Sequence, residues 1–112
     1  MKVTITLADE FKRKARQLAK KYHSLSDDLI EFQKSLMKNP LQGDSLGHGV
    51  RKARMPIASK GKGKSGSARV LTLTILVSDD ADVTLLTIYD KSEMSNVSDK
   101  YIKWPVDQHH SK

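Results

Sequence analysis

Hydrophobic and polar residues alternate at the start of the chain and then change to a helical spacing. Val3 and Ile5 alternate with polar neighbours, which predicts a short, half-buried strand. A helix is expected to begin near Thr6, because Thr6 and Asp9 are spaced as in a capping box. One face of this helix carries the apolar residues Leu7, Phe11, Ala15, Leu18 and Tyr22.

A second apolar stripe predicts another helix directly after the first. Its cap is expected within residues 24–27, and Asn39-Pro40 ends it because proline cannot continue a helix. The stripe consists of Leu25, Leu29, Phe32 and Leu36. Two helices joined by a few residues form a hairpin, and its apolar side needs a sheet to pack on. Residues 41–49 hold three glycines and predict a loop.

The rest of the pattern predicts three more strands joined by short links. The first covers residues 50–58, and the second contains the apolar run VLTLTILV. A turn at residues 79–82 leads into the third, at residues 83–91. Consecutive strands with such short links form an antiparallel meander.

A short C-terminal helix is expected after these strands, beginning at Ser95 or Ser98 and closed by Pro105. The predicted fold class is therefore α+β, with the order β-α-α-β-β-β-α. A helical hairpin packs on a small, mostly antiparallel sheet. We expect one domain over residues 1–105, followed by a polar tail at residues 106–112.

Charge is concentrated in residues 51–69, which hold seven basic residues and no acidic one. Residues 1–50 carry nine basic and six acidic side chains (+3), and residues 70–112 carry four and seven (−3), so the net charge of +7 equals that of this segment. Such a field attracts polyanions such as nucleic acid, although a solvated surface loop is the alternative. The basic residues of the segment are Arg51, Lys52, Arg54, Lys60, Lys62, Lys64 and Arg69.

Part of the basic segment, ASKGKGKS, matches the loose pattern of a nucleotide-binding loop. Such a loop must open a helix, whose N-terminal amides face the phosphates. Here the pattern is followed by a β-branched, apolar run, so we interpret it as a long hairpin loop between two strands.

The composition points to no cofactor. The chain has no cysteine, and its four histidines are scattered, so neither thiolate nor histidine spacing indicates a metal site. No apolar run is long enough to span a membrane, and the N-terminus lacks the apolar core of a signal peptide. We therefore expect a cytoplasmic protein without a metal or membrane association.

The predicted element order and two segments resemble the RelE/ParE superfamily of bacterial toxin–antitoxin toxins. The resemblance is closest to the HigB/RelE type. One segment is RKARM followed by ASKGKGKSGSARV, and the other is LLTIYDKSEMSNVS. The resemblance implies a ribosome-dependent endoribonuclease that cleaves messenger RNA (mRNA), with mRNA, the ribosome and a cognate antitoxin as partners.

By this resemblance, five residues correspond to the catalytic positions of the family: Lys52, Arg54, Arg69, Tyr89 and Lys91. The other basic residues of the segment, Arg51, Lys60, Lys62 and Lys64, are expected to bind RNA. RelE carries a further arginine where this chain has Ser92. This departure leaves the general acid open.

The residue types fit a reaction in which the 2′-OH of RNA attacks the adjacent phosphate. Cations stabilise the phosphorane, a lysine among other cations could accept the proton, and a tyrosine could stack on a base or donate a proton. Two other functions stay open: a ParE-like inhibitor of DNA gyrase, which shares the fold but cleaves nothing, and a non-catalytic RNA-binding protein.

Overall fold

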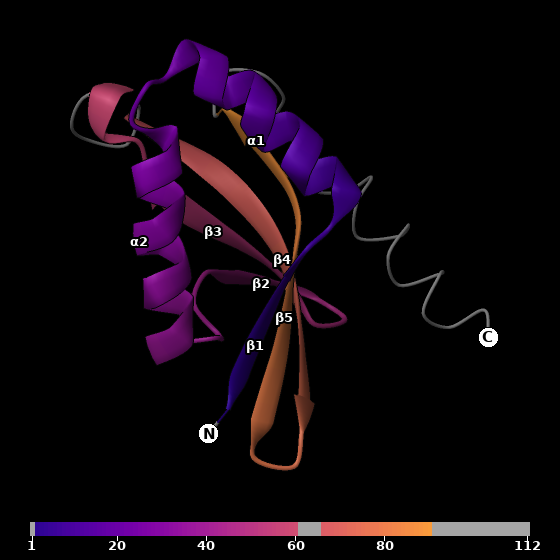
Figure 1. Cartoon of the computed structure of the whole chain (residues 1–112). Helices are drawn as coiled ribbons and strands as arrows, with labels where there is room; N and C mark the ends of the chain where they lie inside the picture. The colour runs from indigo at the N-terminus through magenta and orange to yellow at the C-terminus, as the bar shows by residue number, and fades with distance from the viewer. Residues whose placement is uncertain (1, 61–65, 91–112) are drawn as a thin grey trace.

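Five strands form one sheet in the computed structural model, which describes residues 2–60 and 66–90 (Figure 1). The strand order is β1-β5-β4-β3-β2; β1 pairs in parallel with β5, and all other neighbours are antiparallel. The elements are β1 (Val3–Leu7), α1 (Asp9–Lys21), α2 (Leu25–Lys38), β2 (Asp44–Gly47), β3 (Val50–Pro56), the 3₁₀ turn η1 (Ala58–Lys60), β4 (Ser67–Val77) and β5 (Asp80–Asp90). The α+β fold predicted from the sequence is confirmed.

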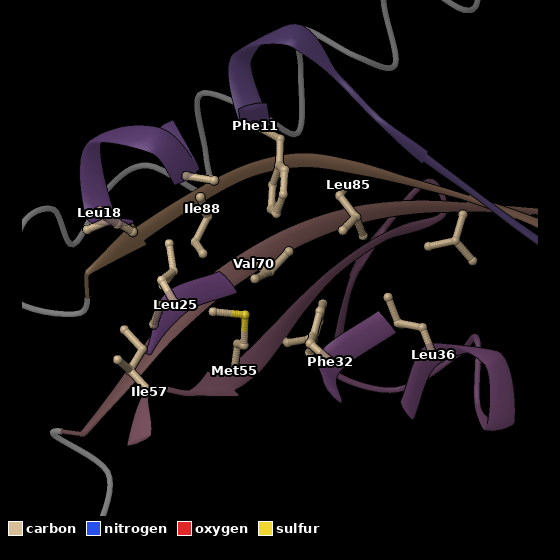
Figure 2. Packing of buried hydrophobic residues seen from close by; sticks show 14 residues of the cluster. Phe11, Leu18, Leu25, Phe32, Leu36, Met55, Ile57, Val70, Leu85 and Ile88 are labelled. Carbon is tan, nitrogen blue, oxygen red and sulfur yellow. The ribbon is translucent and has the colours of Figure 1, made fainter. Parts of the chain in front are cut away.

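Both helices pack on the same face of the sheet, and the predicted apolar stripes form the contact. Helix α1 lies mainly over β5, and α2 contacts β1 and β3 (Figure 1). Figure 2 shows the core between them, where Phe11 and Leu18 of α1 and Phe32 of α2 meet strand residues such as Val70 and Leu85. These side chains are almost fully buried, and their removal from water is the main stabilising contribution to the fold.

The N-terminal end of α1 differs from the prediction. Thr6 lies within β1, and the helix begins at Asp9 with Ala8 at the cap position and no side-chain cap hydrogen bond. Pairing with β5 is the reason, because β1 stays in register as far as Leu7 opposite Leu85, and the Ala8 amide donates to the Leu85 carbonyl (3.0 Å). The cap predicted within residues 24–27 is correct in position: Ser24 is the N-cap of α2.

Residues 41–49 are not simply a loop, as predicted, because they contain β2. This strand forms a hairpin with β3 through the two-residue turn His48-Gly49, and both turn residues have positive φ (58° and 82°). Such a pair of positive φ values is typical of the tight turns that match the twist of a hairpin. The strand is short and polar, so its own sequence carries little strand signal.

The β4–β5 turn is tighter than predicted. It consists of Ser78 and Asp79 alone, and residues 80–82 already belong to β5. The long link between β3 and β4 does connect antiparallel strands, with Pro56 opposite Ser67, and no helix follows the glycine-lysine run. The nucleotide-binding loop is thereby excluded. The predicted C-terminal helix and polar tail lie outside the described residues.

No helix in residues 2–60 and 66–90 is long and apolar enough to cross a membrane.

Candidate functional site

A row of polar side chains crosses the middle of the sheet on the face away from the helices. In β3, Lys52 and Arg54 alternate with Ala53 and Met55, whose side chains join the helix-covered core. Lys52 and Arg54 therefore point to the opposite face, as their spacing predicts. We call this the distal face.

The strand register places the other candidates beside them. Arg54 is directly opposite Arg69 of β4, and Arg69 is directly opposite Tyr89 of β5. Cross-strand partners project to the same side, with Cβ atoms about 5 Å apart. Arg54, Arg69 and Tyr89 thus form a continuous row across three strands, although fifteen and twenty positions separate them in the sequence.

Three of these side chains line one pocket of about 480 Å³. Lys52, Arg54 and Arg69 supply its positive charge, and the remaining lining residues are Gln42, Gly43, Asp44 and Ala53. Arg69 is half-buried and its Nη1 donates a hydrogen bond to Ser67 Oγ (2.9 Å), which holds the guanidinium in place. Arg54 is exposed and free to meet a ligand.

The cations of this pocket have no acidic partner within the described part of the chain. The ion pairs found there, Glu10–Arg13 and Glu31–Lys34, join residues within one helix each. Like charges directly opposite on neighbouring strands destabilise a sheet, so the Arg54–Arg69 pair carries a cost in the free protein. An anion that bound both guanidinium groups would remove that cost, and phosphate fits their planar donor geometry.

Tyr89 borders the row and differs from the cations in its environment. Its ring packs against a small apolar cluster on the distal face, and its phenol is half-buried. Burial raises the pKa of Tyr89 above its ordinary value of 10.0, and the positive charge of Arg69 opposes part of this rise. A phenol is neutral at physiological pH even at its ordinary pKa, and the rise keeps it so, which leaves Tyr89 able to donate a hydrogen bond or a proton. The cluster consists of Val50, Leu71, Leu73 and Leu86, with Leu46 beside it.

A sequence model described as the RelE toxin of the RelE/RelB toxin–antitoxin system matches residues 5–107. The chain belongs to the RelE toxin family. The match covers most of the 112 residues, from within β1 through every later element described above. A RelE-family toxin acts within a toxin–antitoxin module, so a cognate antitoxin is its partner.

Arg51 is separated from the other candidates of this RelE-family toxin. It alternates with Lys52 and so projects toward the helix-covered side, where its Nη1 donates to the Gly43 carbonyl (3.3 Å). The structure therefore does not bring Arg51 into the pocket with Lys52 and Arg54. The side chains of Lys60, Lys62, Lys64 and Lys91 lie outside the described residues, and their roles stay predictions.

Sequence reasoning missed the side of the pocket formed by Gln42, Gly43 and Asp44, because residues 41–49 were expected to form a loop. One signal could have found it: Gly47 and Gly49 lie on either side of His48 directly before the next strand, and glycine favours the positive φ values of tight turns. Within the described ranges, no group of three or more His, Cys, Asp or Glu side chains comes together as a metal site would require.

Proposed function

We propose that this RelE-family toxin is an endoribonuclease that cleaves mRNA on the ribosome. The observation that carries the proposal is the convergence of Lys52, Arg54 and Arg69 in one pocket beside the neutral phenol of Tyr89. A gyrase inhibitor needs no such arrangement, because it has no reaction intermediate to stabilise.

Each residue type has a defined task in the proposed reaction. The RNA's own 2′-OH attacks the adjacent phosphate, and negative charge builds on the two free phosphate oxygens. Arg54 and Arg69 bind these oxygens, because each guanidinium stays charged and presents paired donors. Tyr89 donates a proton to the departing 5′-oxygen, a role that requires the neutral form, which its raised pKa maintains. The reaction requires no metal ion.

The remaining basic residues are proposed to attract RNA rather than to act on the phosphate. Arg51, Lys60, Lys62 and Lys64 belong to the same basic segment, whereas Lys91, two positions after Tyr89, stays a predicted catalytic residue. A single ion pair at a solvent-exposed position contributes only about 0–1 kcal/mol. Together, however, such charges raise the local concentration of a polyanion and its rate of association.

The decisive test is single-turnover cleavage of mRNA on purified ribosomes by the wild type and Arg69→Ala. We expect the variant to lose roughly 100-fold or more in rate, because Arg69 is a held charge in the pocket. The matched control is Arg16→Ala, which removes a guanidinium from the exposed surface of α1 on the other side of the sheet. Circular dichroism and melting establish that both variants fold.

Two results would contradict the proposal. If Arg69→Ala cleaves within about threefold of the wild type while Arg16→Ala is equally active, the pocket is not the active site. If the wild type leaves mRNA intact but inhibits supercoiling by gyrase, the protein is a gyrase inhibitor instead.

Cleavage should also persist in EDTA, because the proposed reaction requires no metal ion. A minimal RNA is the substrate for this test, because intact ribosomes themselves need magnesium.

A further inference from the structure

Asp44 places a carboxylate among the three cations of the pocket. It is the acidic residue that lines this pocket in the described part of the chain, together with Lys52, Arg54 and Arg69. The register of the β2–β3 hairpin sets Asp44 directly opposite Lys52, so their side chains project to the same face. The carboxylate therefore lies on the distal face with the cationic row.

The backbone around Asp44 is held closely against β3. Gly43 has φ +98°, and a Cβ there would lie 2.8 Å from the Lys52 carbonyl oxygen, so only glycine allows this approach. The Gly43 carbonyl also accepts the hydrogen bond from Arg51. Asp44 is thus positioned by a paired strand with a tight turn, which a mobile loop would not provide.

The proposed reaction needs a proton acceptor, and the described residues of the pocket offer few. Arginine cannot be deprotonated in proteins, which excludes Arg54 and Arg69. Tyr89 holds its proton at physiological pH, and burial raises its pKa further. Lysine would have to lose a proton before it could accept one, whereas an ionised carboxylate is an acceptor already. Asp44 also makes no ion pair with Lys52, Arg54 or Arg69 in the described chain, which leaves its oxygens available.

We propose that Asp44 is the general base of the cleavage reaction; this rests on the endoribonuclease function proposed above. The Asp44 carboxylate takes the proton from the 2′-OH as the 2′-oxygen forms its bond to phosphorus. The bond from phosphorus to the 5′-oxygen breaks, and that oxygen receives the Tyr89 proton. The products are a 2′,3′-cyclic phosphate and a 5′-OH, and solvent then takes the proton from Asp44 and returns one to Tyr89.

The first measurement compares the wild type with Asp44→Asn in single-turnover cleavage and in binding of an uncleavable 2′-deoxy substrate. A general base contributes about 10²- to 10⁴-fold in rate, so cleavage should fall by at least 100-fold. Binding should be unchanged or tighter, because a negative charge has left a cationic pocket. The matched control is Asp79→Asn in the exposed β4–β5 turn, which should alter neither quantity.

The second measurement is the pH dependence of the cleavage rate. If a carboxylate accepts the proton, the wild type should lose activity toward acidic pH. The charged and titratable groups that face Asp44 are Lys52, Arg54 and Arg69, with Tyr89 beyond them. Asp44→Asn should lack this acidic limb. A carboxylate that merely supported the hairpin would give a variant with weaker RNA binding and an unchanged pH profile, and that result would overturn the inference.

The two proposals fail in different ways. If the wild type cleaves no RNA, or cleaves a substrate whose attacking 2′-OH is replaced by hydrogen, the endoribonuclease mechanism itself is wrong. If the wild type requires the 2′-OH but Asp44→Asn cleaves at a similar rate with the same pH profile, only the role of Asp44 is wrong.

Discussion

At the scale of single residues, Arg69 and Tyr89 illustrate how two neighbours set each other's chemistry. They are cross-strand partners, one permanently charged and the other a neutral phenol whose pKa is raised by partial burial. Burial disfavours the phenolate, while the adjacent guanidinium stabilises it, and the balance leaves the pKa of Tyr89 above its ordinary value. The phenol can then act as an acid while the guanidinium holds negative charge.

We predict that Arg69→Ala raises the pKa of Tyr89 further, because the stabilising charge is lost while much of the burial stays. In the wild type, the contribution of Tyr89 to stability should be complete below about pH 10 and lost as pH rises through its higher folded-state pKa. NMR titration of labelled tyrosine would measure both values, with Tyr89→Phe identifying the signal. A lower pKa in Arg69→Ala would show that the arginine does not act on the phenol as inferred.

At the scale of elements, the β2–β3 hairpin completes the pocket. Strand β3 presents Lys52 and Arg54 to the pocket, and the opposite side is formed by Gln42 and Gly43, which lead into β2, and by Asp44, its first residue. The close approach at Gly43 sets the distance between these strands. Another glycine of the hairpin, Gly47, also has positive φ (+92°), but a Cβ there would meet nothing within 4 Å.

The two glycines make a matched pair for mutation. Gly47→Ala should destabilise the protein by roughly 1–2 kcal/mol, the cost of an L-residue with left-handed backbone geometry. Gly43→Ala should cost more, because its Cβ would also clash with the backbone of β3, and it should reduce cleavage by displacing Lys52 from Asp44. Urea unfolding and single-turnover cleavage test this. Equal losses of stability and activity in both variants would mean that the close approach is unimportant.

At the scale of the whole molecule, the two faces of the sheet have different tasks. One is covered by α1 and α2 and holds the larger core (Figures 1 and 2). The distal face carries the pocket and its cations. The net charge of +7 equals that of residues 51–69, so electrostatic attraction to any polyanion is directed toward the segment that contains these cations.

We predict that RNA binding weakens steeply with salt. If roughly four to six cations touch phosphates, the logarithm of the affinity should fall by about 0.7 per contact against the logarithm of the salt concentration for a single strand. Fluorescence anisotropy with an uncleavable RNA at several salt concentrations measures the slope. Arg16→Ala should leave this slope unchanged. An affinity that does not depend on salt in the wild type would show that the basic segment is only solvated surface.

The sequence alone was enough to predict those helices and strands whose hydrophobic pattern lies within a few neighbouring residues. The helical spacing of Phe11, Ala15 and Leu18 identified the buried side of α1, and the alternation in β3 placed Lys52 and Arg54 on one face. These predictions succeed because side-chain direction repeats with the period of the element itself. The family match rests on the same information, since it compares sequence alone.

Tertiary structure decided everything that depends on pairing between distant segments. The register that sets Arg54 beside Arg69 and Tyr89 arises from hydrogen bonds among three strands, which no local pattern encodes. The parallel pairing of β1 with β5 likewise moved the start of α1 to Asp9. Strand β2 exists because β3 offers it partners, and only this pairing brings Asp44 to the cations.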